Sequence, residues 1–174
     1  MKRKLQKPSE LRFTFFGTPQ IAVTVLEELE SAEFLPALVI TRPDTPQGRG
    51  NTLTPPLVKT WARARGIPVL QPEKIKSILT ELNAKGPWDV FIVAAYGKIL
   101  PQELLAIPRR GTLNMHPSLL PKLRGPSPIV SAILSDNREA GVSVMLLDAE
   151  MDHGPILAQE KVAVADWPPR ARIL

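Results

Sequence analysis

The fold is indicated most clearly by the stretch Asp89-Val90-Phe91-Ile92-Val93-Ala94-Ala95. Every residue after Asp89 is apolar, so the stretch shows no alternation between a buried face and an exposed face. Strands that are buried on both faces are typical of parallel sheets covered by helices on both sides. We therefore predict that this segment is a central strand of an open, mostly parallel α/β sheet.

The neighbouring segments alternate between strands and helices, as such a sheet requires. Thr18 is expected to cap the first helix, with Pro19 at its first position. Two late strands are expected to be antiparallel or to lie at the sheet edge. The predicted fold class is Rossmann-like, with helices on both faces. The strands are predicted at 12–16, 37–40, 67–70, 111–115, 141–147 and 156–164, and the helices at 19–30, 56–65, 73–83, 101–106 and 126–135.

A polar segment rich in proline and glycine, 41–56, interrupts this alternation. Loops of about 15 residues in compact domains are usually functional or disordered, and we expect this one to be unordered on its own. The basic residues near the N-terminus predict a disordered lead-in, 1–10. The remaining residues, 11–174, are expected to form a single domain without an internal boundary. Because the chain ends soon after the last predicted strand, we expect this domain to be truncated.

The composition narrows the possible chemistry. The chain has no cysteine, which excludes disulfides, cysteine-bound zinc and thiol nucleophiles. With only two histidines, His116 and His153, a site with several histidine ligands is not expected, and no metal is predicted. No apolar run reaches the roughly 20 residues of a membrane-spanning helix, and no signal peptide is visible, so a cytoplasmic protein is predicted. The net charge of +5 suits either an RNA partner or a solvated basic surface.

The residues with the clearest catalytic potential lie at the end of the strand predicted at 111–115 and after it. Asn114 and His116 are two residues apart, so on a continuing strand their side chains point to the same side. An amide beside an imidazole can stabilise an oxyanion, and the imidazole can also carry a proton near neutral pH. Asp152 lies in a turn-like segment, where a carboxylate could orient His116 or accept a proton through water. Singly, each of these residues could equally be a turn or strand-end residue without a catalytic role.

An apolar loop follows directly, with the sequence Pro117-Ser118-Leu119-Leu120-Pro121. Two prolines fix its backbone and lower the entropy cost of holding it ready for a ligand. Its free backbone groups could hydrogen-bond the edge of a heterocycle while the leucines pack on its face. The alternative is a structural turn that leads into the next helix. Gly17-Thr18-Pro19 lacks the G-x-G-x-x-G pattern, so a dinucleotide site is not indicated.

Taken together, Asn114-x-His116, the segment Ser118-Leu119-Leu120-Pro121 and the later Asp152 strongly resemble the folate-dependent formyltransferases. Within that superfamily the chain is most similar to the methionyl-tRNA formyltransferase family. Three further stretches carry this resemblance, which covers about 11–164 and only the catalytic domain of that family. They are Phe16-Gly17-Thr18-Pro19, the loop from Arg42-Pro43-Asp44 to Gly48-Arg49-Gly50, and Ala95-Tyr96-Gly97.

The resemblance implies the formyltransferase fold and a transfer of the formyl group from 10-formyltetrahydrofolate to the α-amine of methionyl-tRNA, which serves translation initiation. It implies a monomer with initiator methionyl-tRNA and folate as partners, and it implies that the family's C-terminal tRNA-binding domain has no counterpart in this chain. The implied catalytic residues are Asn114, His116 and Asp152; the implied folate-binding residues are Ser118, Leu119, Leu120, Pro121, Tyr96 and Gly97.

The long loop resembles the insertion with which this family enters the acceptor stem of the tRNA, so Arg42 and Arg49 are implied phosphate contacts. The family often carries a basic residue where this chain has Thr45, which weakens the expected grip on RNA. Two alternatives stay open. One is a formyltransferase that acts on glycinamide ribonucleotide or another small amine, and the other is a truncated folate-binding or RNA-binding module without activity.

Overall fold

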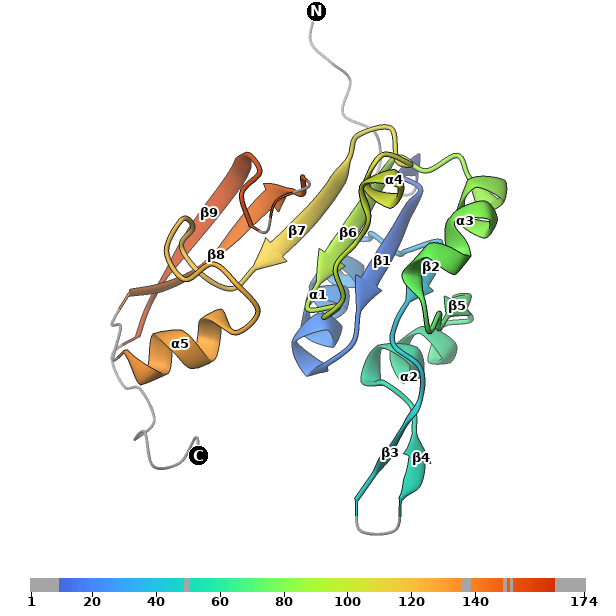
Figure 1. Ribbon diagram of the computed structural model, residues 1–174, viewed down its shortest axis with the longest axis horizontal. Coiled ribbons are helices and arrows are strands. Elements are labelled where there is room, and N and C mark those ends of the chain that lie inside the picture. Colours follow the sequence, from blue (N-terminus) through green and yellow to red (C-terminus); the bar gives the residue numbers. More distant parts are fainter. Residues whose placement is uncertain (1–9, 49–50, 136–138, 149, 151, 165–174) are drawn as a thin grey trace, which may run out of the picture. The chain divides into compact units, whose positions relative to one another are not determined.

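The structure is a computed structural model that describes residues 10–48, 51–135, 139–148, 150 and 152–164. The chain divides into two compact units, Met1–Thr112 and Leu113–Leu174, and the division falls inside the strand β7 (Thr112–His116) (Figure 1). Each unit is described separately below. The predicted lead-in, 1–10, lies outside the described residues except for Glu10. Arg49 also lies outside them.

The first unit contains a parallel sheet of four strands in the order β5-β2-β1-β6. This order confirms the predicted parallel α/β arrangement, because consecutive strands are joined by helical crossovers. The strands are β1 (Phe13–Gly17), β2 (Leu38–Ile40), β5 (Val69–Leu70) and β6 (Val90–Ala94).

Helices connect these strands on both faces of the sheet. From β1 the chain steps to β2 and then to β5, and it returns to the other side of β1 at β6. Right-handed crossovers then place α1 and α2 on one face and α3 on the other. α1 packs against α2, and α2 packs against β2 and β5. The helical segments are α1 (Gln20–Ser31), α2 (Leu57–Ala64), η2 (Ile75–Ile78), α3 (Leu79–Lys85) and α4 (Gln102–Leu105).

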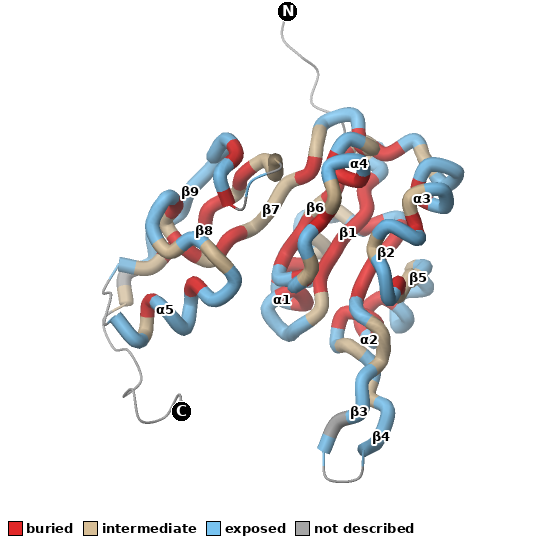
Figure 2. Tube along the Cα trace, viewed as in Figure 1, coloured by how far each residue is buried: buried red, intermediate tan, exposed pale blue. Residues whose placement is uncertain are grey.

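The core of the first unit lies along β1 and β6 (Figure 2). All five residues of β1 are buried, and four of the five in β6 are. Phe16 of β1 packs on Phe91 of β6, with ring centroids 5.3 Å apart. The predicted burial of the 89–95 strand on both faces is therefore confirmed, and it explains why the segment carries no polar alternation.

The second unit is an antiparallel arrangement of β7, β8 (Glu139–Leu146) and β9 (Ile156–Ala163), with α5 (Pro128–Leu134) between β7 and β8 in the chain. The prediction that the last two strands are antiparallel is confirmed. β8 alternates between buried and half-buried residues, which is the pattern of a strand with one covered face.

Thr18 does not cap α1, which corrects the prediction. The helix begins at Gln20, its N-cap residue is Pro19, and no side chain caps it. The hydroxyl of Thr18 instead donates to the backbone carbonyl of Tyr96, at 3.2 Å.

The segment expected to be an unordered loop contains a hairpin. β3 (Thr45–Gln47) pairs with β4 (Thr52–Thr54) in antiparallel register, so that Thr45 lies opposite Thr54. Gly48 and Asn51 adopt left-handed backbone conformations, with φ of +70° and +50°. The N–H of Asn51 donates to the carbonyl of Gly48. Glycine and asparagine enter this conformation at low cost, which suits them to these two positions beside the paired strands.

No helix within the described residues is long and apolar enough to cross a membrane.

Gly17 closes β1 where there is no room for a side chain. A Cβ at this position would lie 2.6 Å from the ring of Phe15, 2.7 Å from the Cβ of Ala22 and 2.9 Å from the carbonyl oxygen of Ala94. We predict that Gly17→Ala lowers the free energy of unfolding by about 1–3 kcal/mol, because the core must shift to accept a methyl group. Urea denaturation measures this loss. Gln20→Ala, at an exposed position three residues later, should change it by no more than about 0.5 kcal/mol, and an equally small effect of Gly17→Ala would contradict the prediction.

Candidate functional site

β7 carries both Asn114 and His116 in the second unit. Asn114 lies opposite Met145 of β8 and His116 lies opposite Ser143, so the two side chains project from the same side of the strand. His116 is buried, whereas Asn114 is half-buried. Within the described residues the amide of Asn114 makes no hydrogen bond. Its N–H groups are therefore available to an oxygen from outside the protein.

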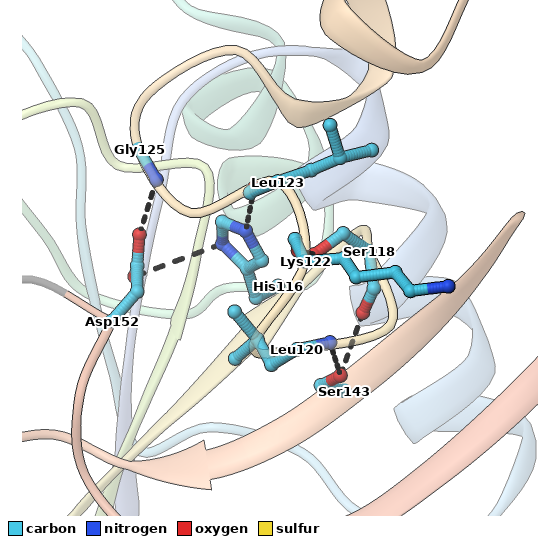
Figure 3. Close-up of polar contacts among 8 residues, drawn as sticks. All are labelled: His116, Ser118, Leu120, Lys122, Leu123, Gly125, Ser143 and Asp152. Atoms are coloured by element: carbon cyan, nitrogen blue, oxygen red, sulfur yellow. Dashed lines mark hydrogen bonds and ion pairs between the residues drawn. The ribbon is translucent and has the colours of Figure 1, made fainter. Parts of the chain in front are cut away.

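Asp152 is brought to His116 from a turn 36 residues later in the chain (Figure 3). The carboxylate oxygen Oδ1 of Asp152 lies 3.7 Å from the imidazole Nδ1, and both side chains are more than nine-tenths buried. At this distance the pair is an electrostatic contact and not a direct hydrogen bond. The other oxygen, Oδ2, accepts a hydrogen bond of 2.8 Å from the backbone N–H of Gly125. The structure therefore unites these two predicted residues.

The second ring nitrogen of His116 is also engaged. Nε2 lies 3.0 Å from the backbone carbonyl oxygen of Leu123. A carbonyl can only accept, so Nε2 carries the hydrogen and Nδ1 is the nitrogen that faces the carboxylate of Asp152. His116 and Asp152 consequently hold the same loop at two points, Leu123 and Gly125.

Two residues of this cluster have unusual backbone conformations. Leu123 has a φ of +56° and Asp152 a φ of +50°, in the left-handed region that residues with a side chain enter at a cost. Such conformations persist only where the surroundings enforce them, and they gather at functional sites. The two hydrogen bonds to His116 and Gly125 are the enforcing contacts here.

The apolar loop is organised around Ser143 of β8, which is fully buried. The hydroxyl of Ser143 donates to the carbonyl of Ser118 at 2.6 Å and accepts from the backbone N–H of Leu120 at 3.0 Å (Figure 3). It also accepts from the side-chain amide of Gln159 at 2.9 Å, and that amide donates to the carbonyl of Leu120 as well. The hydroxyl of Ser143 thereby uses its one O–H donor and both of its acceptor lone pairs.

Ser143 and Gln159 were not among the residues predicted for the site. A signal for Ser143 exists: it lies on the buried phase of β8, between Gly141 and Met145, where an apolar residue would be expected. A buried hydroxyl must find partners, so its position predicts a polar contact. No comparable signal marks Gln159, because it lies on the exposed strand β9.

The expectation that the loop offers free backbone groups is wrong in large part. Besides the bonds to Ser143, the N–H of Ser118 donates to the carbonyl of His116, and the Ser118 hydroxyl donates to the carbonyl of Lys122. Leu120 is 5% exposed, and Leu119 packs on Gly141 so tightly that a Cβ there would overlap it. A cavity of about 20 Å³ lies beside the loop, which has room for a water molecule and not for a ring. Ser118, Leu119, Leu120 and Pro121 therefore form a rigid segment whose leucines already contact protein.

Tyr96 and Gly97, predicted to line a pterin pocket, follow β6 in the first unit. The ring of Tyr96 is 1% exposed and packs edge-on against Phe16. Its hydroxyl has no partner among the described residues, and burial raises the pKa of Tyr96 to about 12. Gly97 has a φ of +75°, and a Cβ there would overlap the guanidinium of Arg42. Tyr96 is therefore part of the core, and of this pair only Gly97 is exposed.

Arg42 does not present its guanidinium freely. Its Nε donates to the carbonyl of Tyr96 at 3.2 Å, and its Nη2 donates to the carbonyl of Gly97. The residue predicted to contact tRNA phosphates is thus used to hold the loop that follows β6. Ile99, two residues beyond Gly97, is 80% exposed, and the sequence analysis did not single it out.

The turn that carries Asp152 is closed by Asp148 and His153. The imidazole Nδ1 of His153 lies 3.1 Å from Asp148 Oδ2, and the hydrogen bond from His153 is the main reason that the pKa of Asp148 lies below its ordinary value. The backbone N–H of Glu150 donates to the other oxygen of Asp148. His153 is exposed, as a turn residue is expected to be, and its role is to close this turn.

Comparisons with known proteins show the family to which this chain is related. The model of the formyl transferase family matches residues 11–167. The chain is 50% identical over 164 residues to a methionyl-tRNA formyltransferase of Chloroflexus aurantiacus, and 44% identical over 158 residues to one of Anaeromyxobacter dehalogenans. These matches cover 93% and 90% of the chain but 52% and 50% of the relatives, so the chain spans about half their length.

A phosphoribosylglycinamide formyltransferase structure from Bacillus halodurans has a TM-score of 0.71 to this chain at 24% identity, and the match covers 93% of this chain and 84% of that one. A second, from Streptococcus pneumoniae, has a TM-score of 0.72 at 22% identity, over 93% and 87% of the two chains. At these identities the likeness shows the fold, and it confirms the predicted formyltransferase fold. Given a family match over most of its length, the chain belongs to the formyl transferase family.

Proposed function

We propose that this chain is the formyl-transferring part of a methionyl-tRNA formyltransferase. It would move the formyl group of 10-formyltetrahydrofolate to the α-amine of initiator methionyl-tRNA. The observation that carries the proposal is the contact of His116 with Asp152 on the strand that presents Asn114, in a chain 50% identical to a methionyl-tRNA formyltransferase. We further propose that it acts as a monomer in the cytoplasm.

The reaction requires that an oxyanion is stabilised. The amine attacks the formyl carbon, a carbon–nitrogen bond forms, and the carbonyl oxygen becomes negative. The carbon–N10 bond then breaks, and the proton lost by the amine goes to N10 of the folate. Among the described residues the N–H groups of the Asn114 amide have no partner, so in this proposal they donate to the oxyanion. One donor of this kind contributes about 2.7–4 kcal/mol to the stability of the transition state.

His116 supplies the second donor in this proposal. Its Nε2 already donates to an oxygen, the carbonyl of Leu123, so the proposal requires that this bond is exchanged for a bond to the formyl oxygen. When Nδ1 is also protonated, the positive ring faces the carboxylate of Asp152 at 3.7 Å. The buried carboxylate then stabilises the charged ring and can take part in moving the amine proton. Asn114, His116 and Asp152 are the proposed catalytic residues.

The proposed substrate-binding residues lie on two segments. Ser118, Leu119, Leu120 and Pro121 would bind the folate as a rigid segment, because Ser143 fixes its backbone before any ligand arrives. Tyr96 and Gly97 are also proposed as folate-binding residues, at the pterin. The β3–β4 hairpin would contact the tRNA, with Arg49 as a phosphate contact and Arg42 at its base.

Substrate competition tests the proposal. The chain is incubated with 10-formyltetrahydrofolate and either methionyl-tRNA or glycinamide ribonucleotide, and the formylated product is measured. We expect transfer to methionyl-tRNA. Turnover of glycinamide ribonucleotide alone would identify a small-amine formyltransferase, and binding of a folate analogue without any transfer would identify a binding module.

Removal of the imidazole should stop catalysis without removing the folate. We predict that His116→Ala lowers kcat by at least about 10²-fold, since it deletes an oxyanion donor, while the affinity for a folate analogue changes by less than about threefold. Single-turnover rates and calorimetry measure the two effects. His153→Ala, at the only other histidine, should leave both unchanged. A loss of folate binding together with catalysis would point to a structural role of His116.

Ser143 should set the affinity for the folate. We predict that Ser143→Ala raises the KM for 10-formyltetrahydrofolate and lowers the free energy of unfolding by about 1–3 kcal/mol, because the amide of Leu120 and the carbonyl of Ser118 lose a buried partner. Ser131→Ala, at an exposed position of α5, is the matched control. An unchanged folate KM in a destabilised Ser143 variant would show that the loop does not bind folate.

A further inference from the structure

Asp44 forms the most enclosed ion pair of the first unit, immediately before β3. Both of its carboxylate oxygens accept hydrogen bonds from Nζ of Lys59, at 2.7 and 2.6 Å. The side chain of Lys59 is 8% exposed and that of Asp44 is 22% exposed. An ammonium group this well buried is uncommon unless it is paired, so the pairing fixes both side chains.

The pair joins the two ends of the β3–β4 hairpin. Asp44 is the residue before β3, and Lys59 lies on α2, five residues after β4 ends. A contact between them therefore closes the hairpin at its base, on the side where it meets the sheet. α2 itself packs against β2 and β5, so the closing contact is made to the body of the first unit.

Gln71 ties the same base to the sheet. Its side-chain amide donates to Asp44 Oδ1 at 2.7 Å and to the carbonyl of Arg42 at 2.8 Å. Gln71 directly follows β5, which pairs with β2. The chain that enters the hairpin is consequently held at two successive points, Arg42 and Asp44.

These contacts keep Asp44 ionised. The hydrogen bonds from Lys59 and then from Gln71 hold the pKa of Asp44 below its ordinary value, and Arg63 adds a weaker attraction. A carboxyl group with a lowered pKa stabilises the folded state above the pKa it has when unfolded, and this contribution is lost only as the pH falls through the lowered value. The base of the hairpin is therefore closed at neutral pH.

Beyond its base the hairpin pairs with no other strand of the described residues. β3 and β4 form a separate two-stranded sheet (Figure 1). Leu53 of β4 is 64% exposed. A two-stranded ribbon is marginally stable alone in water, so its direction depends on the contacts at its base. A partner that binds the hairpin therefore depends on the orientation that Asp44 and Lys59 give it.

We propose that Lys59, acting through Asp44, is a positioning residue that holds the β3–β4 hairpin in the orientation needed to bind the RNA substrate. This inference rests on the proposed function of the chain as a methionyl-tRNA formyltransferase. Lys59 acts on the RNA site only through the hairpin, since its ammonium is occupied by Asp44. The role is distinct from that of a phosphate-binding lysine, which would be exposed.

The test replaces the ammonium and keeps the apolar stem. Lys59→Met should raise the KM for methionyl-tRNA at least tenfold, while the KM for 10-formyltetrahydrofolate and the kcat at saturating tRNA stay within twofold. Hydrogen exchange of the β3 and β4 amides should become faster without any RNA. Lys76→Met is the matched control, because Lys76 is 70% exposed and its ion pair with Glu103 is 3.8 Å long; it should change none of these quantities.

A charge-reversed pair separates positioning from loss of structure. Asp44→Lys combined with Lys59→Asp keeps one charge of each sign at the base, and it should bring the tRNA KM back to within about threefold of the unmodified chain, even if Lys59→Met folds poorly. Three results would overturn the inference. The hairpin amides could exchange no faster in Lys59→Met, or they could exchange faster while the tRNA KM stays unchanged. The third result is a charge-reversed pair whose tRNA KM is no better than that of Lys59→Met. If the unmodified chain formylates no methionyl-tRNA, the proposed function is contradicted and not the positioning role. Filter binding of tRNA to the same variants would then test the positioning role, because it measures tRNA affinity without catalysis.

Discussion

The first unit depends on the parallel pairing of β1 with β2 on one side and β6 on the other. Because every residue of β1 is buried, the strand can be placed only in the middle of a sheet that helices cover on both faces. Parallel strands end at the same edge of a sheet, so the residues after β1, β2 and β6 meet there. The contacts of Thr18 and Arg42 with the carbonyl of Tyr96 are the direct consequence.

The second unit depends on a different constraint, the satisfaction of buried polar groups. Ser143, His116 and Asp152 are all buried, and each would destabilise the fold if its polar atoms lacked partners. Each finds them in one stretch of backbone, from Ser118 to Gly125. The residues proposed for catalysis and the loop proposed for folate binding therefore stabilise each other, which explains why they occur together in the sequence pattern.

Both segments proposed to bind substrates are fixed before a ligand arrives. A buried hydroxyl orders the apolar loop, and a buried ion pair orders the base of the hairpin. Ordering a segment in advance removes an entropy cost from binding, because fewer conformations are lost when the ligand arrives. In each case the ordering residue lies on a neighbouring strand or helix and does not belong to the segment that it orders.

The sequence alone determined the elements whose signals are local. The apolar run at 90–95 indicated a strand covered on both faces, and the spacing of Asn114 and His116 on β7 determined that their side chains share a face. The family pattern added Asp152, far along the chain. Only the tertiary structure decided which polar groups are consumed by the protein itself: the guanidinium of Arg42, the hydroxyl of Thr18 and most of the backbone of the Ser118–Pro121 loop. The physical reason is that a hydrogen bond between distant segments does not show in the sequence of either one which partner it joins. The partners of Ser143, and the roles of Gln159 and Lys59, are therefore decided only when the strands and helices are packed.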